Sequence, residues 1–201
     1  GDLIVLLYLL EVPALCEVLA GYSSRSLYGQ VGSSREAILW LGYNLPFLAA
    51  VLSLAIQAKS LTLAALGAVP FGPVHLAAQA AFLFALPGHL KRNPFSIPNA
   101  EQEIVAGPFT EYSGAPLALF EMAHGLEMVA LVSLFTVFFL PVGRGQATGW
   151  LAYLLGSGAL IAAITLVATA TARFTVRHAF RFYWSWGAGA AILALVIAGI
   201  R

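Results

Sequence analysis

Two glutamates and a histidine stand in steps of three within an apolar part of the chain. Glu121, His124 and Glu127 would share one face of a helix, with a rise of about 4.5 Å per step. Burial raises the pKa of carboxyl groups and lowers that of imidazoles, which brings both toward neutrality. Such groups can accept and release protons. The spacing therefore predicts a proton path; the alternative is that Glu121 pairs with a loop arginine and His124 with a neighbouring helix.

A second apolar stretch carries Glu11 and Glu17. An ionisable side chain at the centre of a lipid bilayer costs about 2.5–3.5 kcal/mol, so it requires a function or a partner. These two residues are interpreted either as members of the same proton path or as structural partners of a basic residue on an adjacent protein chain. The predicted path comprises Glu11, Glu17, Glu121, His124 and Glu127.

The chain shows no pattern for holding a metal or a redox cofactor of its own. The Glu-x-x-His-x-x-Glu spacing of residues 121–127 is not read as a metal site, because zinc hydrolases use tighter histidine motifs with a defined third ligand. Cys16 is the only cysteine, which excludes an iron–sulfur cluster and an internal disulfide. Phosphate loops, nucleophile elbows and Cys-x-x-Cys pairs are also missing from the sequence.

Composition identifies the elements that must position these groups. Of 201 residues, 60% are hydrophobic and 9% are charged, with a mean hydropathy of +0.87, whereas soluble domains carry about 25% charged residues. The chain is therefore predicted to be an all-α, polytopic transmembrane helix bundle, a single domain over residues 1–201. The net charge of +1 gives no indication of a nucleic-acid partner. Six spans are expected, at Leu3–Gly21, Ala37–Ala58, Leu66–His89, Pro116–Leu140, Gly149–Ala172 and Tyr183–Ile200.

The loops between the expected spans lie alternately on the two sides of the membrane, and the basic residues divide unequally between these sides. Lys59, Arg144 and Arg201 fall on one side, and seven cations fall on the other. The positive-inside rule places the richer side in the cytoplasm, with loops at about 22–36, 90–115 and 173–183. The expected location is a prokaryotic cytoplasmic membrane, and the elaborate face is expected to bind a partner. Its seven cations are Arg25, Arg35, Lys91, Arg92, Arg173, Arg177 and Arg181.

Several polar runs carry a specific pattern. They are residues 94–104 (PFSIPNAEQEI), Gly107, 110–114 (TEYSG), 118–120 (ALF), 20–28 (AGYSSRSLY), 34–36, 172–174 and 178–182. Together these runs resemble the family of Complex I membrane subunits that abut the quinone chamber, with homologues in formate hydrogenlyase and in energy-converting and archaeal membrane-bound hydrogenases. The resemblance covers nearly the whole chain, although family members are usually longer and have more spans.

This resemblance implies a non-catalytic subunit that anchors a redox arm and couples it to H⁺ or Na⁺ transport. It implies hydrogenase-like large and small subunits on the cytoplasmic face, which would hold the nickel–iron centre and iron–sulfur clusters, and antiporter-like subunits in the membrane. A coupling loop would comprise Glu101, Glu103 and Glu111 with Arg35, Lys91 and Arg92. The peripheral arm would dock on Arg25, Arg173, Arg177 and Arg181.

Departures from the family pattern help to choose between a hydrogenase subunit and a quinone-site subunit of respiratory Complex I. Asn44 and His89 stand where Complex I subunits usually carry glutamate, and His124 replaces the glutamate of their Ala-Glu-Tyr run. The loss of these carboxylates favours the hydrogenase branch over a quinone-site subunit of respiratory Complex I, which is the first alternative and would bind quinone. A stand-alone secondary transporter is the second alternative; it would show inverted repeats, and none is visible.

Overall fold

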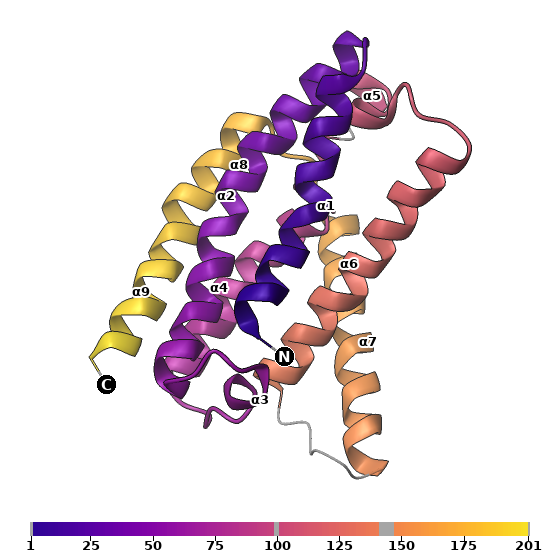
Figure 1. The fold of residues 1–201 in the computed structure, drawn as a ribbon. Helices are drawn as coiled ribbons and strands as arrows, with labels where there is room; N and C mark the ends of the chain where they lie inside the picture. The colour runs from indigo at the N-terminus through magenta and orange to yellow at the C-terminus, as the bar shows by residue number, and fades with distance from the viewer. Residues whose placement is uncertain (1, 99–100, 141–146, 201) are drawn as a thin grey trace.

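The structure, a computed structural model, describes residues 2–98, 101–140 and 147–200 and consists of helices joined by short connections (Figure 1). The all-α bundle predicted from the sequence is confirmed. The elements in chain order are α1 (Leu3–Ser23), α2 (Leu27–Ala58), α3 (Leu63–Leu66), α4 (Pro73–His89), α5 (Glu101–Ile104), η1 (Gly107–Phe109), α6 (Ala115–Phe139), α7 (Ala147–Ala170), α8 (Val176–Phe182), η2 (Tyr183–Gly187) and α9 (Ala188–Gly199).

Five helices are long and apolar enough to cross a membrane. They are α1, α2, α6, the 149–170 part of α7, and the continuous helix formed by α8, η2 and α9. The remaining predicted segment, Leu66–His89, contains α4, which has 17 residues. A helix of that length spans about 25 Å, less than the roughly 30 Å of a bilayer core.

After α4 the chain continues as a non-helical segment, residues 90–98, most of whose apolar side chains are buried in the protein. Lys91 adopts a left-handed backbone conformation with φ of 48°, and Pro94 and Pro98 cannot donate backbone hydrogen bonds. Phe95 and Ile97 are buried. Irregular backbone is tolerated where protein surrounds it, so this segment can bring polar side chains to the interior.

Helix α2 begins at Leu27, well before the predicted span at Ala37, and so includes most of the predicted loop at 22–36. The glycines and serines there are weak helix formers, but they allow close packing. A Cβ on Gly32 would lie 2.6 Å from Cδ of Pro108 in η1, and one on Gly21 would lie 1.9 Å from Oγ of Ser33. Small residues let helices approach closely, and this tertiary packing outweighs the local preference.

An aromatic layer forms the core between α2, α4 and α6. Phe47, Phe82, Phe135 and Phe139 are all buried, and neighbouring ring centroids lie 5.3 to 5.8 Å apart. In Figure 1, α6 and α7 stand beside the group formed by α1, α2, α4 and α9. Only 6% of the apolar stretch of α7 is buried, so this helix presents most of its surface to lipid or to another protein.

The three polar loop regions meet at one end of the bundle. The Phe174 amide donates to the Pro94 carbonyl at 2.9 Å, and the Tyr112 hydroxyl donates to the Ala20 carbonyl at 3.0 Å. Helix α3 lies at the opposite end (Figure 1). This arrangement agrees with the sequence analysis, which put these three loops on the same side of the membrane. That this side is the cytoplasmic one stays a prediction.

Candidate functional site

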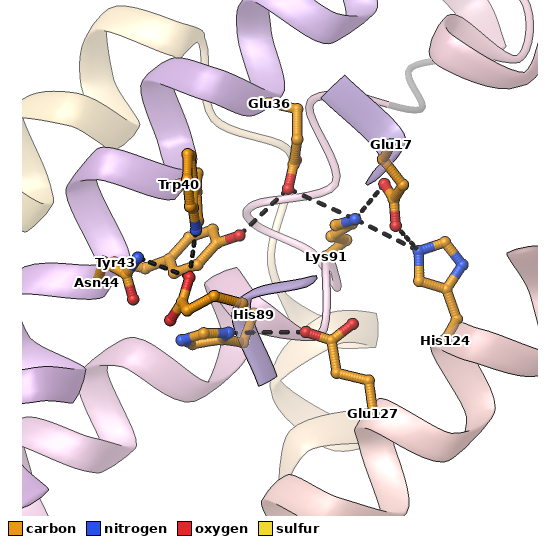
Figure 2. A network of polar contacts seen from close by, with 10 residues as sticks. Glu17, Glu36, Trp40, Tyr43, Asn44, His89, Lys91, His124 and Glu127 are labelled. Carbon is orange, nitrogen blue, oxygen red and sulfur yellow. Dashed lines mark hydrogen bonds and ion pairs between the residues drawn. The ribbon is translucent and has the colours of Figure 1, made fainter. Parts of the chain in front are cut away.

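Lys91 occupies the centre of a buried group of charged residues (Figure 2). It lies just beyond the end of α4, and its Nζ forms an ion pair with Glu17 of α1. The same atom lies 3.4 Å from Oε1 of Glu36 on α2. One cation from the irregular segment 90–98 is therefore shared by two carboxylates on different helices.

Burial makes this sharing energetically important. Glu17 is 2% exposed and Glu36 is fully buried, and an unpaired charge in such a place costs several kcal/mol. Burial alone would lower the pKa of Lys91, but the carboxylates of Glu36 and Glu17 outweigh it and raise that pKa above its usual value. The two carboxylates thus favour the charged form of Lys91, and its single charge can balance only one of them.

His124 of α6 supplies the next contact. Its Nε2 lies 2.6 Å from Oε1 of Glu17 and 3.3 Å from Nζ of Lys91. This nitrogen either carries a hydrogen that it donates to Glu17 or accepts a hydrogen bond from Lys91, since it cannot do both at once. The geometry therefore admits two arrangements that differ in the position of one proton.

Tyr43 connects this group to a second ion pair. Its hydroxyl donates to Oε1 of Glu36 at 3.1 Å, and its ring centroid lies 4.3 Å from that of His89. Nδ1 of His89 lies 3.7 Å from Oε1 of Glu127, and both side chains are almost fully buried. We call Glu17, Glu36, Tyr43, Lys91 and His124 the Lys91 network, and we call the other two residues the His89–Glu127 pair.

A cavity of about 340 Å³ joins the Lys91 network to the His89–Glu127 pair. Both nitrogens of His89 are buried and have no hydrogen-bond partner in the described part of the protein. A water molecule takes about 30 Å³ of liquid volume, and buried waters typically satisfy such polar groups. The cavity is large enough for several waters, which would complete a hydrogen-bonded route between the two groups. It is lined by His89, Leu90, Lys91, Arg92, Glu121, His124, Gly125, Glu127 and Met128.

The sequence matches the family model described as NADH dehydrogenase over residues 1–199. The chain belongs to this family. It is 40% identical over 153 residues to Hydrogenase-4 component C of Escherichia coli strain K12, covering 73% of this chain and 48% of that protein. It is 34% identical over 142 residues to the H subunit of the NADH-quinone oxidoreductase of Syntrophotalea carbinolica, covering 67% of this chain and 43% of the relative. The chain thus spans about half the length of these relatives.

A solved structure gives the same family fold. A chain of the membrane-bound sulfane sulfur reductase, an archaeal respiratory membrane complex, superposes with a TM-score of 0.90 at 25% identity, over 98% of this chain and 69% of that chain. The resemblance to Complex I and hydrogenase membrane subunits that the polar motifs indicate is confirmed. The site described above is therefore a feature of an NADH dehydrogenase family membrane protein.

Three of the five residues predicted for the proton path meet in this NADH dehydrogenase family fold. Glu17 and His124 belong to the Lys91 network, and Glu127 lies beside the same cavity. Glu121 lines the cavity but is exposed. Glu11 has its hydrogen bonds with residues outside the Lys91 network: Asn44 donates to its Oε2 at 2.8 Å, and the indole of Trp40 also donates to it.

Sequence reasoning does not identify Glu36, Tyr43 or His89 as site residues. Glu36 ends a serine-rich run that resembles a loop, where a carboxylate is usually solvated, and His89 stands out only as a departure from the family pattern. The sequence assigns Lys91 to the coupling loop, whereas the structure places it at the centre of the buried charges. The sequence feature that could have identified these residues is that each is a polar residue next to an apolar run.

Of the residues predicted for the coupling loop, Arg35 and Glu103 form an ion pair with each other. Arg35 Nη1 lies 2.6 Å from Oε2 of Glu103. Glu111 and Arg92 are exposed and form no ion pair with the residues that the structure describes. Glu101 begins α5, and its side chain lies outside the described part.

The four arginines predicted for docking lie in the α1–α2 turn, just after α7, and on α8. Arg25 lies in the turn between α1 and α2 and is exposed, as are Arg177 and Arg181 on α8. Arg173 is half-buried, and its Nε donates to the Ser96 hydroxyl at 3.1 Å. Exposed cations on two separate elements remain available to a partner at this end of the bundle.

Proposed function

We propose that this chain is the membrane-anchor and energy-coupling subunit of a Complex I-related, membrane-bound nickel–iron hydrogenase. It would link redox chemistry in a docked cytoplasmic arm to translocation of H⁺ or Na⁺, without performing the redox step. The observation that carries this proposal is one buried lysine shared by two carboxylates, with His124 in contact. The 40% identity to Hydrogenase-4 component C favours a hydrogenase arm.

Consecutive residues of α2 provide the mechanical link. Arg35 pairs with Glu103 in the loop region, and Glu36 faces Lys91 in the interior. A charge change in the docked arm would pull on the half-exposed Arg35–Glu103 pair. Because Arg35 and Glu36 are adjacent in one helix, such a shift would change the distance between Glu36 and Lys91.

Competition for Lys91 converts this movement into proton transfer. A carboxylate that loses a nearby cation binds a proton more tightly. When Lys91 moves toward Glu36, Glu17 is left without its cation and takes a proton from Nε2 of His124, which lies 2.6 Å away. His124 is then refilled through the hydrated cavity from the His89–Glu127 pair.

The apolar core favours lateral transfer over transfer straight through this chain. Phe47 lies directly against His89, with ring centroids 4.6 Å apart, and it begins the aromatic layer that includes Phe82, Phe135 and Phe139. Protons do not cross a dry aromatic layer readily. The protons would instead pass sideways to antiporter-like subunits that perform the translocation.

Replacing Glu17 by Gln tests the proposed function in the assembled complex. The amide cannot carry a transferable proton, so we expect dye-linked hydrogen oxidation to persist while ion pumping in proteoliposomes falls at least about tenfold, the effect of losing a general acid–base group. Asp2→Asn is the matched control, since Asp2 caps α1 at the far end and Asn caps helices equally well. Normal pumping by Glu17→Gln would refute the proposal.

A quinone-site subunit of respiratory Complex I is the second candidate, favoured by the 34% identity to the H subunit of an NADH-quinone oxidoreductase. The proteins that copurify with the full-length chain distinguish the two. A nickel-containing large subunit supports the hydrogenase assignment, whereas a tightly bound quinone together with an NADH-oxidising arm supports the alternative.

A further inference from the structure

A second cavity lies between α6, α7 and residues 90–96, and it shares Leu90, Lys91, Arg92 and Met128 with the wall of the first cavity. Its volume is about 680 Å³, within the range of small-molecule sites in proteins. We call it the side cavity. We propose that the side cavity binds the phosphate headgroup of an anionic phospholipid, with Arg92 and Arg173 as its ligands.

The charge of the side cavity favours an anion. Arg92, Arg173 and Lys91 contribute to its wall, and no aspartate or glutamate lines it within the described ranges. Lys91 is already paired with Glu17 and Glu36. Arg173 uses Nε to contact Ser96, which leaves its two terminal nitrogens for a ligand, and Arg92 is exposed without a carboxylate partner in the described part of the chain.

The remaining wall of the side cavity favours a lipid over a small soluble anion. Met128 and Val132 of α6 face Ile161, Ile164 and Ala168 of α7 across it. These apolar side chains belong to two helices suited to crossing a membrane, and they provide a surface for acyl chains. A soluble phosphate would leave that surface uncovered, whereas a phospholipid would cover it.

The position of the side cavity agrees with the depth of lipid headgroups. Arg173 follows the end of α7 at Ala170, and Thr165 and Thr169 of the last turns also line the cavity. Helix ends lie at the membrane interface, and basic pockets between spanning helices on the cytoplasmic side bind anionic headgroups. This end of the bundle carries more cations than the other end, so the positive-inside rule predicts that it faces the cytoplasm.

Native mass spectrometry of the delipidated full complex, titrated with phosphatidylglycerol, tests this site. We expect one molecule bound to the wild type and binding about tenfold weaker for Arg92→Gln or Arg173→Gln, because each removes a charge-assisted hydrogen bond. Lys59→Gln, which removes an exposed cation beyond the other end of α2, should bind phosphatidylglycerol as the wild type does. Phosphatidylcholine, which carries no net charge, should bind more weakly to all variants.

A cavity-filling variant keeps the proposal testable if the loss of an arginine disturbs folding. Ala168→Trp retains both arginines but occupies the space between α6 and α7, so it should also weaken phosphatidylglycerol binding. Wild-type lipid binding by Ala168→Trp and both arginine variants would overturn the proposal. Arginine-dependent binding of inorganic phosphate without phospholipid would overturn it as well. Pumping is a separate readout, so failure here leaves the proposed coupling function untouched.

Discussion

At the scale of single residues, the buried site holds three carboxylates and one lysine. Glu17, Glu36 and Glu127 are buried carboxylates, and Lys91 is the lysine that faces them. When all three carboxylates are ionised, their charge exceeds that of Lys91 by two units, so charge balance requires protons bound within the site. Because a buried excess of negative charge is unfavourable, the site is suited to take up protons and to release them when an external charge changes.

Replacing Lys91 by Met should destabilise the protein strongly. The change leaves Glu17 and Glu36 without a cation in a buried place, and breaking a buried ion pair costs about 3–5 kcal/mol. We expect a lower unfolding temperature of the detergent-solubilised complex. Lys59→Met, at an exposed position, should have little effect.

A second change tests whether unpaired charge is the cause. Adding Glu36→Gln to Lys91→Met removes one uncompensated carboxylate, so the double variant should recover part of the stability that the single variant loses. Additive destabilisation by the two changes would show that Lys91 and Glu36 do not interact energetically.

At the scale of elements, α2 combines two roles. It is the longest helix, with 32 residues, and it contacts α1, α4 and α9. Its first turns present Arg35 toward Glu103 and Glu36 toward Lys91. A rigid helix transmits a displacement along its axis, so α2 is suited to connect the loop region with the buried charges.

Replacing Glu103 by Gln should reduce coupling with little loss of stability. The Glu103 side chain is 58% exposed, and exposed ion pairs contribute about 0–1 kcal/mol. We therefore expect a nearly unchanged unfolding temperature but several-fold lower pumping per hydrogen oxidised, measured in proteoliposomes.

Exchanging the two charges provides the internal control. Arg35→Glu combined with Glu103→Arg restores an ion pair of opposite orientation and should recover part of the pumping. Unchanged pumping in Glu103→Gln would contradict a role for this pair in coupling.

At the scale of the whole molecule, the two ends of the bundle differ in character. Exposed arginines of the α1–α2 turn and of α8 lie at the end that holds the polar loops, whereas Lys59 follows α2 at the other end. This asymmetry predicts that one end faces the cytoplasm and carries the redox arm.

Cysteine labelling from either side of the membrane tests this orientation. In a Cys16→Ser background, Arg25→Cys and Arg177→Cys should react with an impermeant thiol reagent only from the cytoplasmic side, and should be protected when the arm is bound. Lys59→Cys should react from the opposite side. Protection of the Lys59 position by the arm would reverse the assignment.

The sequence alone determined the class of fold, the family and the polar regions. Lipid as the solvent requires long apolar helices, so hydropathy located the spans, and the run from Pro94 to Ile104 carried the family pattern. Spacing within one helix placed His124 and Glu127 on one face, and both line the same cavity in the structure. The short length of α4 was not visible, because its apolar flank at 66–72 resembles the continuation of a span.

Only the tertiary structure decided which charges meet. Lys91 and Glu17 are 74 residues apart, and their contact depends on the chain turning inward after α4. Periodicity describes neighbours within one helix, but it does not specify which residue of another helix lies opposite. For the same reason Glu36, on a different helix, became a partner of Lys91, while Glu121, one helical turn from His124, remained at the surface.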